Sequence, residues 1–185
     1  DSLGSMFFIG YIITNKKLED FENTCHLSCG DCQRCIKACP GGALSEAEFD
    51  MYNCVSYLTQ KKGVLSLSEM KKMGTMIYGC DVCQMVCPKN ANVLGENFND
   101  IENAMPRLRF LLSLSNSEFK KTYGKTAIGW RGRNVIARNA LVVASNIKKP
   151  ESLELLSEFL NDERPLIKHT ALRGIYNLGY KSGAD

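Results

Sequence analysis

Eight of the nine cysteines fall into two groups that complete each other, and this pattern constrains the fold more than any other feature. The first group reads Cys29-x2-Cys32-x2-Cys35-x3-Cys39-Pro40, and the second reads Cys80-x2-Cys83-x3-Cys87-Pro88. Four thiolates hold a cubane [4Fe–4S] cluster, and in the bacterial two-cluster ferredoxin run the fourth cysteine ligates the other cluster. The second group lacks one ligand, which Cys54 alone can supply. The spacing therefore predicts two clusters, one on Cys29, Cys32, Cys35 and Cys87 and the other on Cys39, Cys54, Cys80 and Cys83.

Zinc and disulfides are the alternative uses of these cysteines. Structural zinc takes two CxxC pairs or Cys/His sets, which three successive cysteines at x2 spacing fit poorly. The apolar run from Met6 to Tyr11 is too short to span a bilayer and follows no basic segment. We therefore expect a cytoplasmic protein with reduced thiols and no membrane contact. Cys25 stands outside the pattern, either as a spare thiol or as a substitute for Cys29.

The 185 residues carry a formal net charge of +3, which is split unevenly along the chain. Residues 1–100 carry a net charge of −3, and residues 101–185 carry +6. This division indicates a redox half followed by a basic half. The chain begins at Asp1 and not at methionine, and Phe7–Ile9 and Tyr11–Ile13 are rich in strand formers. We expect an edge strand there and a longer parent protein.

The cysteine-rich segment, residues 25–90, is expected to be rich in loops with short helices. Cys32 to Ala38 should form one helix that ends at Pro40. Leu65 to Met76 should form another, capped by Ser66 or Ser68 and carrying Glu69 in its first turn.

From about Ile101 the apolar residues recur at helical spacing. Pro150 and Pro165 stand where helices would begin. The stretch from Arg138 to Ile147 is echoed 31 residues later, from His169 to Leu178. This period suggests HEAT-like stacking of paired helices. The predicted fold class is α+β, mostly α: a ferredoxin-like two-[4Fe–4S] domain followed by an α-helical HEAT-like repeat region.

A run without acidic residues extends from Phe119 to Pro150 and carries Tyr123 and Trp130 among its basic residues. Lysine and arginine neutralise phosphates, and aromatic rings stack on unpaired bases, so we expect nucleic-acid binding. The alternative is a solvated helix face with a buried tryptophan. His26 and His169, the only histidines, are assigned to local hydrogen bonding and to packing.

These residues together resemble the epoxyqueuosine reductases, cobalamin-dependent iron–sulfur enzymes of queuosine biosynthesis in tRNA. The likeness extends over essentially the whole chain, and the stretches that carry it are Phe7–Gly10, Cys29–Leu44, Cys54–Thr59, Tyr78–Pro88 and Arg133–Ala140. The chain departs from the family at Lys89, where an aromatic residue is usual.

The resemblance implies that epoxyqueuosine at the wobble position of tRNA is reduced to queuosine, with electrons passed through two [4Fe–4S] clusters to cobalamin. It further implies three parts: residues 1–24 as the remnant of a cobalamin-binding domain, residues 25–100 as the two-cluster domain, and residues 101–185 as a HEAT-like tRNA-binding region. The catalytic residues are expected in the missing N-terminal domain. An external electron donor and a monomeric state are also expected.

Two further sets of site residues follow from the resemblance. Ser56 and Asp81 flank ligands of the second cluster and are candidates for contacting cobalamin; the alternative is that they hydrogen-bond cluster sulfurs or backbone. The expected tRNA contacts are Lys61, Lys62, Lys120, Lys121, Arg131, Arg133 and Arg138.

Three other functions remain open at this point. A stand-alone ferredoxin-type electron-transfer module would have no affinity for RNA. A cobalamin-dependent reductive dehalogenase would have no use for the basic helical region. A tRNA-binding module with structural clusters would hold clusters that never change oxidation state.

Overall fold

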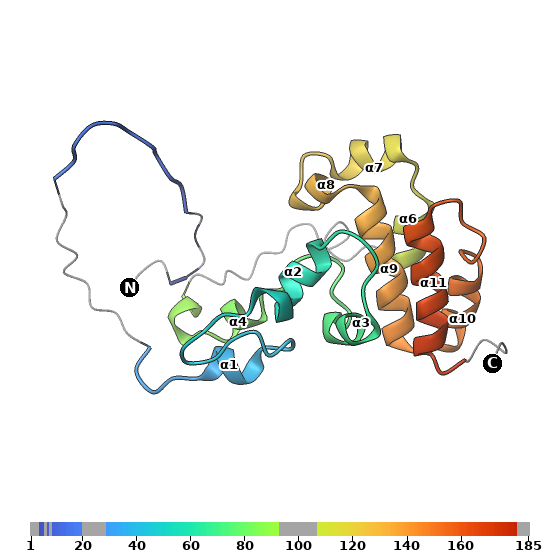
Figure 1. Cartoon of the computed structure of the whole chain (residues 1–185), viewed down its shortest axis with the longest axis horizontal. Helices are drawn as coiled ribbons and strands as arrows, with labels where there is room; N and C mark the ends of the chain where they lie inside the picture. Colours follow the sequence, from blue (N-terminus) through green and yellow to red (C-terminus); the bar gives the residue numbers. More distant parts are fainter. Residues whose placement is uncertain (1–3, 6, 8, 20–28, 93–106, 181–185) are drawn as a thin grey trace.

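The computed structural model describes residues 4, 5, 7, 9–19, 29–92 and 107–180, and these residues are mostly helical (Figure 1). The predominantly helical class predicted from the sequence is thus confirmed. No helix in the described ranges has the length and apolar character needed to cross a bilayer. The helices are α1 (Arg34–Ala38), η1 (Met51–Asn53), α2 (Val55–Gln60), α3 (Leu67–Met73), α4 (Val82–Met85), η2 (Pro88–Asn90), α6 (Leu108–Ser113), α7 (Asn116–Tyr123), α8 (Ala127–Arg131), α9 (Arg133–Ile147), α10 (Pro150–Ser157) and α11 (Pro165–Asn177).

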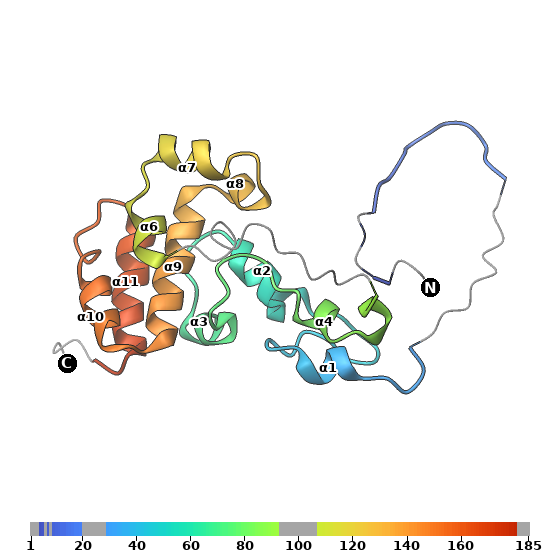
Figure 2. The same cartoon turned by 180° about the vertical axis from the view of Figure 1, so that it is seen from behind.

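Helix α9 is the centre of the molecule. Every residue from Val135 to Ser145 is buried, because other helices pack around all sides of α9. Helices α6, α10 and α11 pack against it on one side, and α2 and α3 pack on another. Figures 1 and 2, seen from opposite directions, both place α9 between these two sets. Its buried residues include the polar Arg138 and Asn139, so the position of α9 between other helices, and not an all-apolar surface, accounts for its burial.

The cysteine-bearing segment and the C-terminal helices share a hydrophobic core. Val55 of α2 and Met70 and Met73 of α3 are buried against Val142 and Val143 of α9. A larger core joins α9 to α6, α7, α10 and α11. Because α9 contributes to both cores, the two halves of the chain are packed into one body. The domain boundary expected near residue 100 lies outside the described residues.

Asparagines of α9 and α11 continue this connection through hydrogen bonds. Asn146 Nδ2 donates to the carbonyl oxygens of Met70 and Gly74, at 2.6 and 2.7 Å, at the end of α3. Asn177 Nδ2 donates to Asn146 Oδ1 at 3.0 Å. Asn146 and Asn177 are equivalent positions of the two repeated stretches. The two stretches therefore contact each other directly, between α9 and α11.

Local signals placed several helix ends correctly. Ser66 caps α3, and its hydroxyl and the Glu69 carboxylate form a reciprocal capping box. Pro150 and Pro165 are the first residues of α10 and α11. Helix α1 was expected from Cys32 but begins at Arg34, two residues later.

The strand expected over Phe7–Ile9 and Tyr11–Ile13 is not formed in the part of it that the structure describes. Residues 9–14 have no regular secondary structure, and Ile12 and Ile13 are 93% and 101% exposed. A strand needs a partner for its backbone groups, and the described ranges contain no other strand, only a single bridge between Leu44 and Phe49. Figure 1 shows residues 9–19 as an arc away from the helices.

Candidate metal centres and nucleic-acid interface

Three cysteines of the first predicted ligand set line one cavity, called here the first cysteine cavity. Cys29, Cys32 and Cys35 line it, and Cys35 lies in α1. The Cys32 amide donates to the Cys29 carbonyl oxygen at 3.1 Å, which closes the turn between them. Cys87, the fourth predicted ligand, does not line this cavity. It precedes η2, just after α4, and α4 packs against α1.

All four cysteines of the second predicted set line another cavity, called here the second cysteine cavity. They are Cys39, Cys54, Cys80 and Cys83. Cys39 ends α1, Cys54 precedes α2, and Cys83 lies in α4. The cavity wall also includes Val55 and Phe49. Residues that are up to 44 positions apart in the chain are thus brought to one place.

Two glycines make this convergence possible. A Cβ atom on Gly41 would collide with the carbonyl oxygen of Asn53, so only glycine lets the turn after Cys39 reach the residue before Cys54. Gly79 has φ = 70°, a conformation that favours glycine, and its amide donates to Thr59 Oγ1 at 3.0 Å. That bond ties the residue before Cys80 to α2, which begins just after Cys54.

The electrostatics of the second cysteine cavity reflect its four thiols. Burial raises the pKa of the Cys80 thiol, the Val82 amide opposes that shift, and the charges of Cys54, Asp81 and Cys39 add to it. Burial is also the main cause that raises the pKa of the Cys83 thiol, and the charge of Cys80 raises this pKa further. Thiolates crowded together in this way need a cation to neutralise them, and metal binding releases their protons. The Ala43 amide donates to Cys39 Sγ at 3.2 Å, and such bonds to sulfur tune the potential of an iron–sulfur cluster.

The donor set fits clusters better than single ions. Within the described ranges, no three Cys, His, Asp or Glu side chains converge closely enough to hold one metal ion. A tetrahedral zinc site needs four ligands within about 2.3 Å of one atom. A cubane is larger, and its four thiolates bind different corners. The eight described cysteines are free thiols. Cys25 and His26 lie outside the described residues.

Ser56 and Asp81 lie next to the second cysteine cavity but do not line it. Ser56 is in the first turn of α2, and its carbonyl oxygen accepts from Thr59 Oγ1 at 2.8 Å. Asp81 is exposed, and its carboxylate does not cap α4. Their suggested roles toward cobalamin or cluster sulfurs remain predictions.

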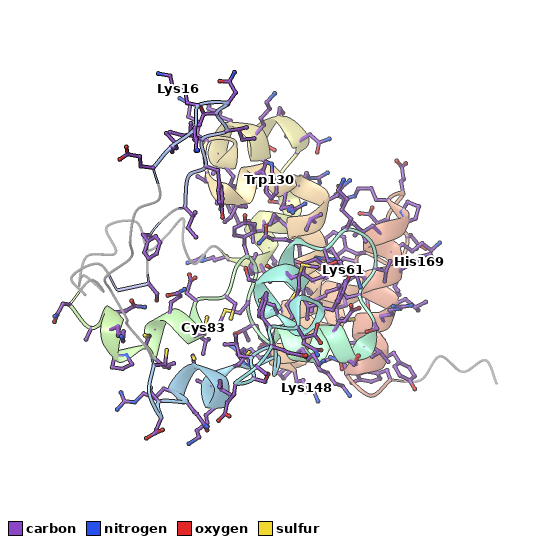
Figure 3. All side chains as sticks on the ribbon, turned by 60° about the vertical axis from the view of Figure 1, so that its left-hand side comes forward. Lys16, Lys61, Cys83, Trp130, Lys148 and His169 are labelled. Atoms are coloured by element: carbon purple, nitrogen blue, oxygen red, sulfur yellow. The ribbon has the colours of Figure 1, made fainter. Side chains whose placement is uncertain are left out.

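The basic run divides into two groups at opposite ends of α9. Lys120, Lys121 and Lys125 are exposed on α7 and the loop after it, and Arg131 and Arg133 are partly exposed nearby. We call these five residues the α7–α8 basic surface. Lys148 and Lys149 follow the other end of α9, about 22 Å away for a helix of 15 residues. Figure 3 shows Trp130 in the upper part of the molecule and Lys148 in the lower part, on either side of Lys61.

Arg138 corrects one predicted tRNA contact. It is 0% exposed, and its guanidinium donates to the carbonyl oxygens of Lys61 at 2.8 Å and Gly63 at 2.9 Å. It also donates to Asn139 Oδ1 and to the carbonyl oxygens of Leu58 and Thr59. Arg138 therefore cannot reach a phosphate in this structure. Its basic type suggested a surface role, whereas the apolar stretches 135–137 and 140–144 around it were the signal for burial.

Other predicted residues have mixed surroundings. Lys61 pairs with Glu69 at 2.5 Å, while Lys62 is exposed. Burial alone would raise the pKa of Glu69, but hydrogen bonds from Lys61 and Ser66 outweigh it and hold that pKa below its usual value. Burial lowers the pKa of Arg133, and the charge of Arg164 lowers it further. His169 is exposed on α11, and not packed as expected.

The two aromatic residues of the basic run have opposite environments. Tyr123 is 2% exposed and belongs to the larger core, so it is not a stacking surface for bases. Trp130 is 72% exposed, which rules out the alternative of a buried tryptophan. Gln60 was not singled out from the sequence, yet it connects Arg131 to α2: Arg131 Nε donates to Gln60 Oε1 at 3.5 Å, and Gln60 Nε2 donates to the Ser56 carbonyl oxygen at 3.2 Å.

Comparisons with known proteins agree with this arrangement. Residues 28–90 match the family described as a 4Fe–4S double cluster binding domain. Epoxyqueuosine reductase from Bacillus subtilis is 38% identical over 98% of this chain and 48% of its own length. An uncharacterized protein of Geobacillus stearothermophilus, named for the gldA 3' region, is 37% identical over 97% of this chain and 85% of its own length.

A solved structure of an epoxyqueuosine reductase is also similar to this chain. The crystal structure of epoxyqueuosine reductase with an epoxyqueuosine-modified tRNA-Tyr stem loop is similar with a TM-score of 0.73 and 40% identity, over 83% of this chain and 42% of that one. The chain spans about half the length of the epoxyqueuosine reductases that it matches. With its cysteine cavities and its likeness along almost its whole length, the chain belongs to the epoxyqueuosine reductase family.

Proposed function

We propose that this chain provides the two-cluster and tRNA-binding parts of an enzyme that reduces epoxyqueuosine to queuosine at the wobble position of tRNA. The observation that carries the proposal is the second cysteine cavity, which gathers Cys39, Cys54, Cys80 and Cys83 in the same body as a basic surface. The relatives named epoxyqueuosine reductase, and the one solved with a modified tRNA stem loop, support the substrate.

The two ligand sets follow the cavities. We assign one [4Fe–4S] cluster to Cys29, Cys32, Cys35 and Cys87, and the other to Cys39, Cys54, Cys80 and Cys83. Three ligands of the first set share a cavity, and packing of α1 on α4 supports Cys87 as the fourth. The clusters would supply one-electron transfer, and cobalamin in the complete protein would supply the chemistry at the epoxide.

The chain's own residues would then hold and tune these groups. The Ala43 amide is directed at Cys39 Sγ, and Gly41 and Gly79 keep the second set together. Ser56 and Asp81 remain the candidates nearest to cobalamin. The α7–α8 basic surface would bind tRNA phosphates, and exposed Lys62 would extend it. Arg138 is not part of that surface.

Finer features of the architecture are part of the proposal. We assign residues 29–92 a ferredoxin-like arrangement of two clusters, supported by the α1–α4 contact. We assign α9–α11 HEAT-like pairing, supported by the contact between Asn146 and Asn177. An external reductant, a monomeric state and a cytoplasmic location complete the proposal, and the free thiols support a reducing compartment.

Cluster analysis and RNA binding on the same preparation test the proposal. Anaerobically prepared protein should contain roughly eight iron and eight sulfide per chain, and Cys54→Ala should lower this toward four of each. The protein should also bind an anticodon stem loop with an affinity that falls steeply with salt. Full iron content in Cys54→Ala would disprove the ligand assignment. Two redox-active clusters without any RNA affinity would instead identify an electron-transfer module.

A further inference from the structure

The only tryptophan of the chain has an unusual position. Trp130 lies in α8 and is 72% exposed, although large aromatic side chains are highly buried on average. Tyr123, seven residues earlier, is 2% exposed. The fold therefore buries one aromatic residue of the basic run and leaves the larger one in water.

The exposure of Trp130 does not come from a loosely attached segment. A Cβ atom on Gly129 would collide with the carbonyl oxygen of Tyr123, so α8 rests directly on the backbone at the end of α7. Thr126 Oγ1 and the Thr126 amide both donate to that same carbonyl oxygen, at 2.7 and 2.9 Å. Tyr123 is anchored in the larger core. The backbone at Trp130, the residue after Gly129, is therefore held in a fixed position although its side chain is exposed.

Arg131 braces the tryptophan from one side. Its guanidinium carbon lies 4.0 Å from the ring centroid of Trp130, within the range of a cation–π contact. Arg131 Nε in turn donates to Gln60 Oε1 on α2. One face of the ring is thus occupied by a cation, and the high exposure of the residue leaves the opposite face accessible.

The surrounding charge selects the kind of partner. Lys120, Lys121 and Lys125 are exposed on the neighbouring α7 and its following loop, and no acidic residue occurs from Phe119 to Pro150. A flat aromatic face among phosphate-binding side chains suits a nucleic acid with unpaired bases, because every base has a face that can stack. A protein partner would more often bring acidic side chains and an apolar surface that encloses the ring.

We propose that Trp130 stacks on an unpaired base of the RNA whose phosphates bind the α7–α8 basic surface. The inference rests on the proposed function and adds a specific recognition element to it. Arg131 would hold the ring in place, and Gln60 would hold Arg131. Through Gln60 and Ser56, this stacking site is connected to the helix that begins after Cys54.

A single tryptophan allows a direct measurement, because its fluorescence reports only this site. Titration of the cluster-containing protein with an anticodon stem loop should quench the fluorescence, whereas a fully paired RNA duplex of equal charge should quench it far less. Trp130→Ala should weaken stem-loop binding about tenfold, the scale of one base–aromatic stack, without changing the salt slope. Trp130→Phe should retain most of the affinity. Tyr180→Ala, at an exposed aromatic residue after α11, is the matched control and should bind normally.

The outcomes separate this inference from the function on which it rests. If the stem loop binds in a salt-dependent way, but fluorescence is unchanged and Trp130→Ala binds like the wild type, stacking is wrong and tRNA binding stands. Equal quenching by the duplex would also overturn stacking, since a closed duplex offers no free base. If the wild-type protein binds no RNA at all, the proposed function itself fails.

Discussion

The Nη1 atom of Arg138 lies 2.8 Å from the carbonyl oxygen of Lys61, so the central helix caps the end of the helix that follows Cys54. The last carbonyl groups of a helix have no partner within it, and burying them without donors is unfavourable. A guanidinium offers five N–H groups in a fixed fork, which suits several carbonyls at once. Burial lowers the pKa of Arg138 to about 10, partly offset by the charge of Glu69, so the group stays charged at neutral pH.

We expect Arg138→Met to lower the free energy of unfolding by about 3–5 kcal/mol, because it leaves buried carbonyl oxygens without donors. Denaturant unfolding under anaerobic conditions measures this. The matched control is Arg109→Met, which removes an exposed arginine paired with Glu158 and should change stability by less than about 1 kcal/mol. A similarly small effect in both variants would show that Arg138 is not structurally important.

The close approach of Gly41 to Asn53 predicts an effect on one cluster only. In Gly41→Ala the new methyl group would collide with the Asn53 carbonyl oxygen and move Cys39 away from Cys54. Iron content should fall from roughly eight toward four per chain, and the electron paramagnetic resonance signal of the second cluster should disappear. Gly10→Ala is the control, because a Cβ there meets nothing within 4 Å. Unchanged spectra in Gly41→Ala would mean that Cys39 is not a ligand of that cluster.

Removal of iron should unfold the cysteine segment in parts. Helices α1 and α4 contribute no residue to either hydrophobic core, so their hydrogen-exchange protection should disappear when a chelator strips the clusters. Helices α2 and α3 share a core with Val142 and Val143 and should stay protected together with α9. Loss of protection in α2 and α3 while α9 stays protected would contradict the shared core.

The two ends of α9 give a matched pair for RNA binding. The double variant Lys120→Ala/Lys121→Ala should reduce the salt slope of stem-loop binding by about one unit for each phosphate that is no longer neutralised. Lys148→Ala/Lys149→Ala removes the same charge at the far end of α9 and should leave the slope nearly unchanged. A salt series of binding isotherms compares them. Equal slopes in both double variants would show that RNA binding depends on overall charge and not on the α7–α8 basic surface.

Structural features that depend on a few neighbouring residues, such as helix starts, were predictable from the sequence. Features that depend on contacts between distant parts of the chain were not. Ser66 with Glu69, and Pro150 and Pro165, signal helix starts by their own chemistry. The grouping of Cys39 with Cys54 was predicted by counting four cysteine ligands for each cluster. The hydrogen-bond partners of Arg138 are carbonyl groups 75 to 80 residues earlier in the chain, and no local pattern identifies them.

The aromatic residues and the N-terminal strand illustrate the same limit. Tyr123 and Trp130 occur in similar basic surroundings, yet one is anchored in the core and the other is exposed. Their environments depend on how α7 and α8 meet at Gly129, which is a matter of tertiary packing. Ile12 and Ile13 have the residue types of a strand, but a strand also requires a second segment to pair with.

The hydrogen bonds from Asn139 to the carbonyl oxygens of Thr59 and Ile77, at 2.7 and 2.6 Å, have a consequence for how the protein matures. They join the segments before Cys80 and after Cys54, and they come from Asn139, which is translated 52 residues after Cys87. A growing chain could present Cys29, Cys32 and Cys35 to the iron–sulfur assembly machinery early. The support of the second cysteine cavity is complete only after α9 has emerged from the ribosome. The order of synthesis thus favours filling of the first cavity before the second.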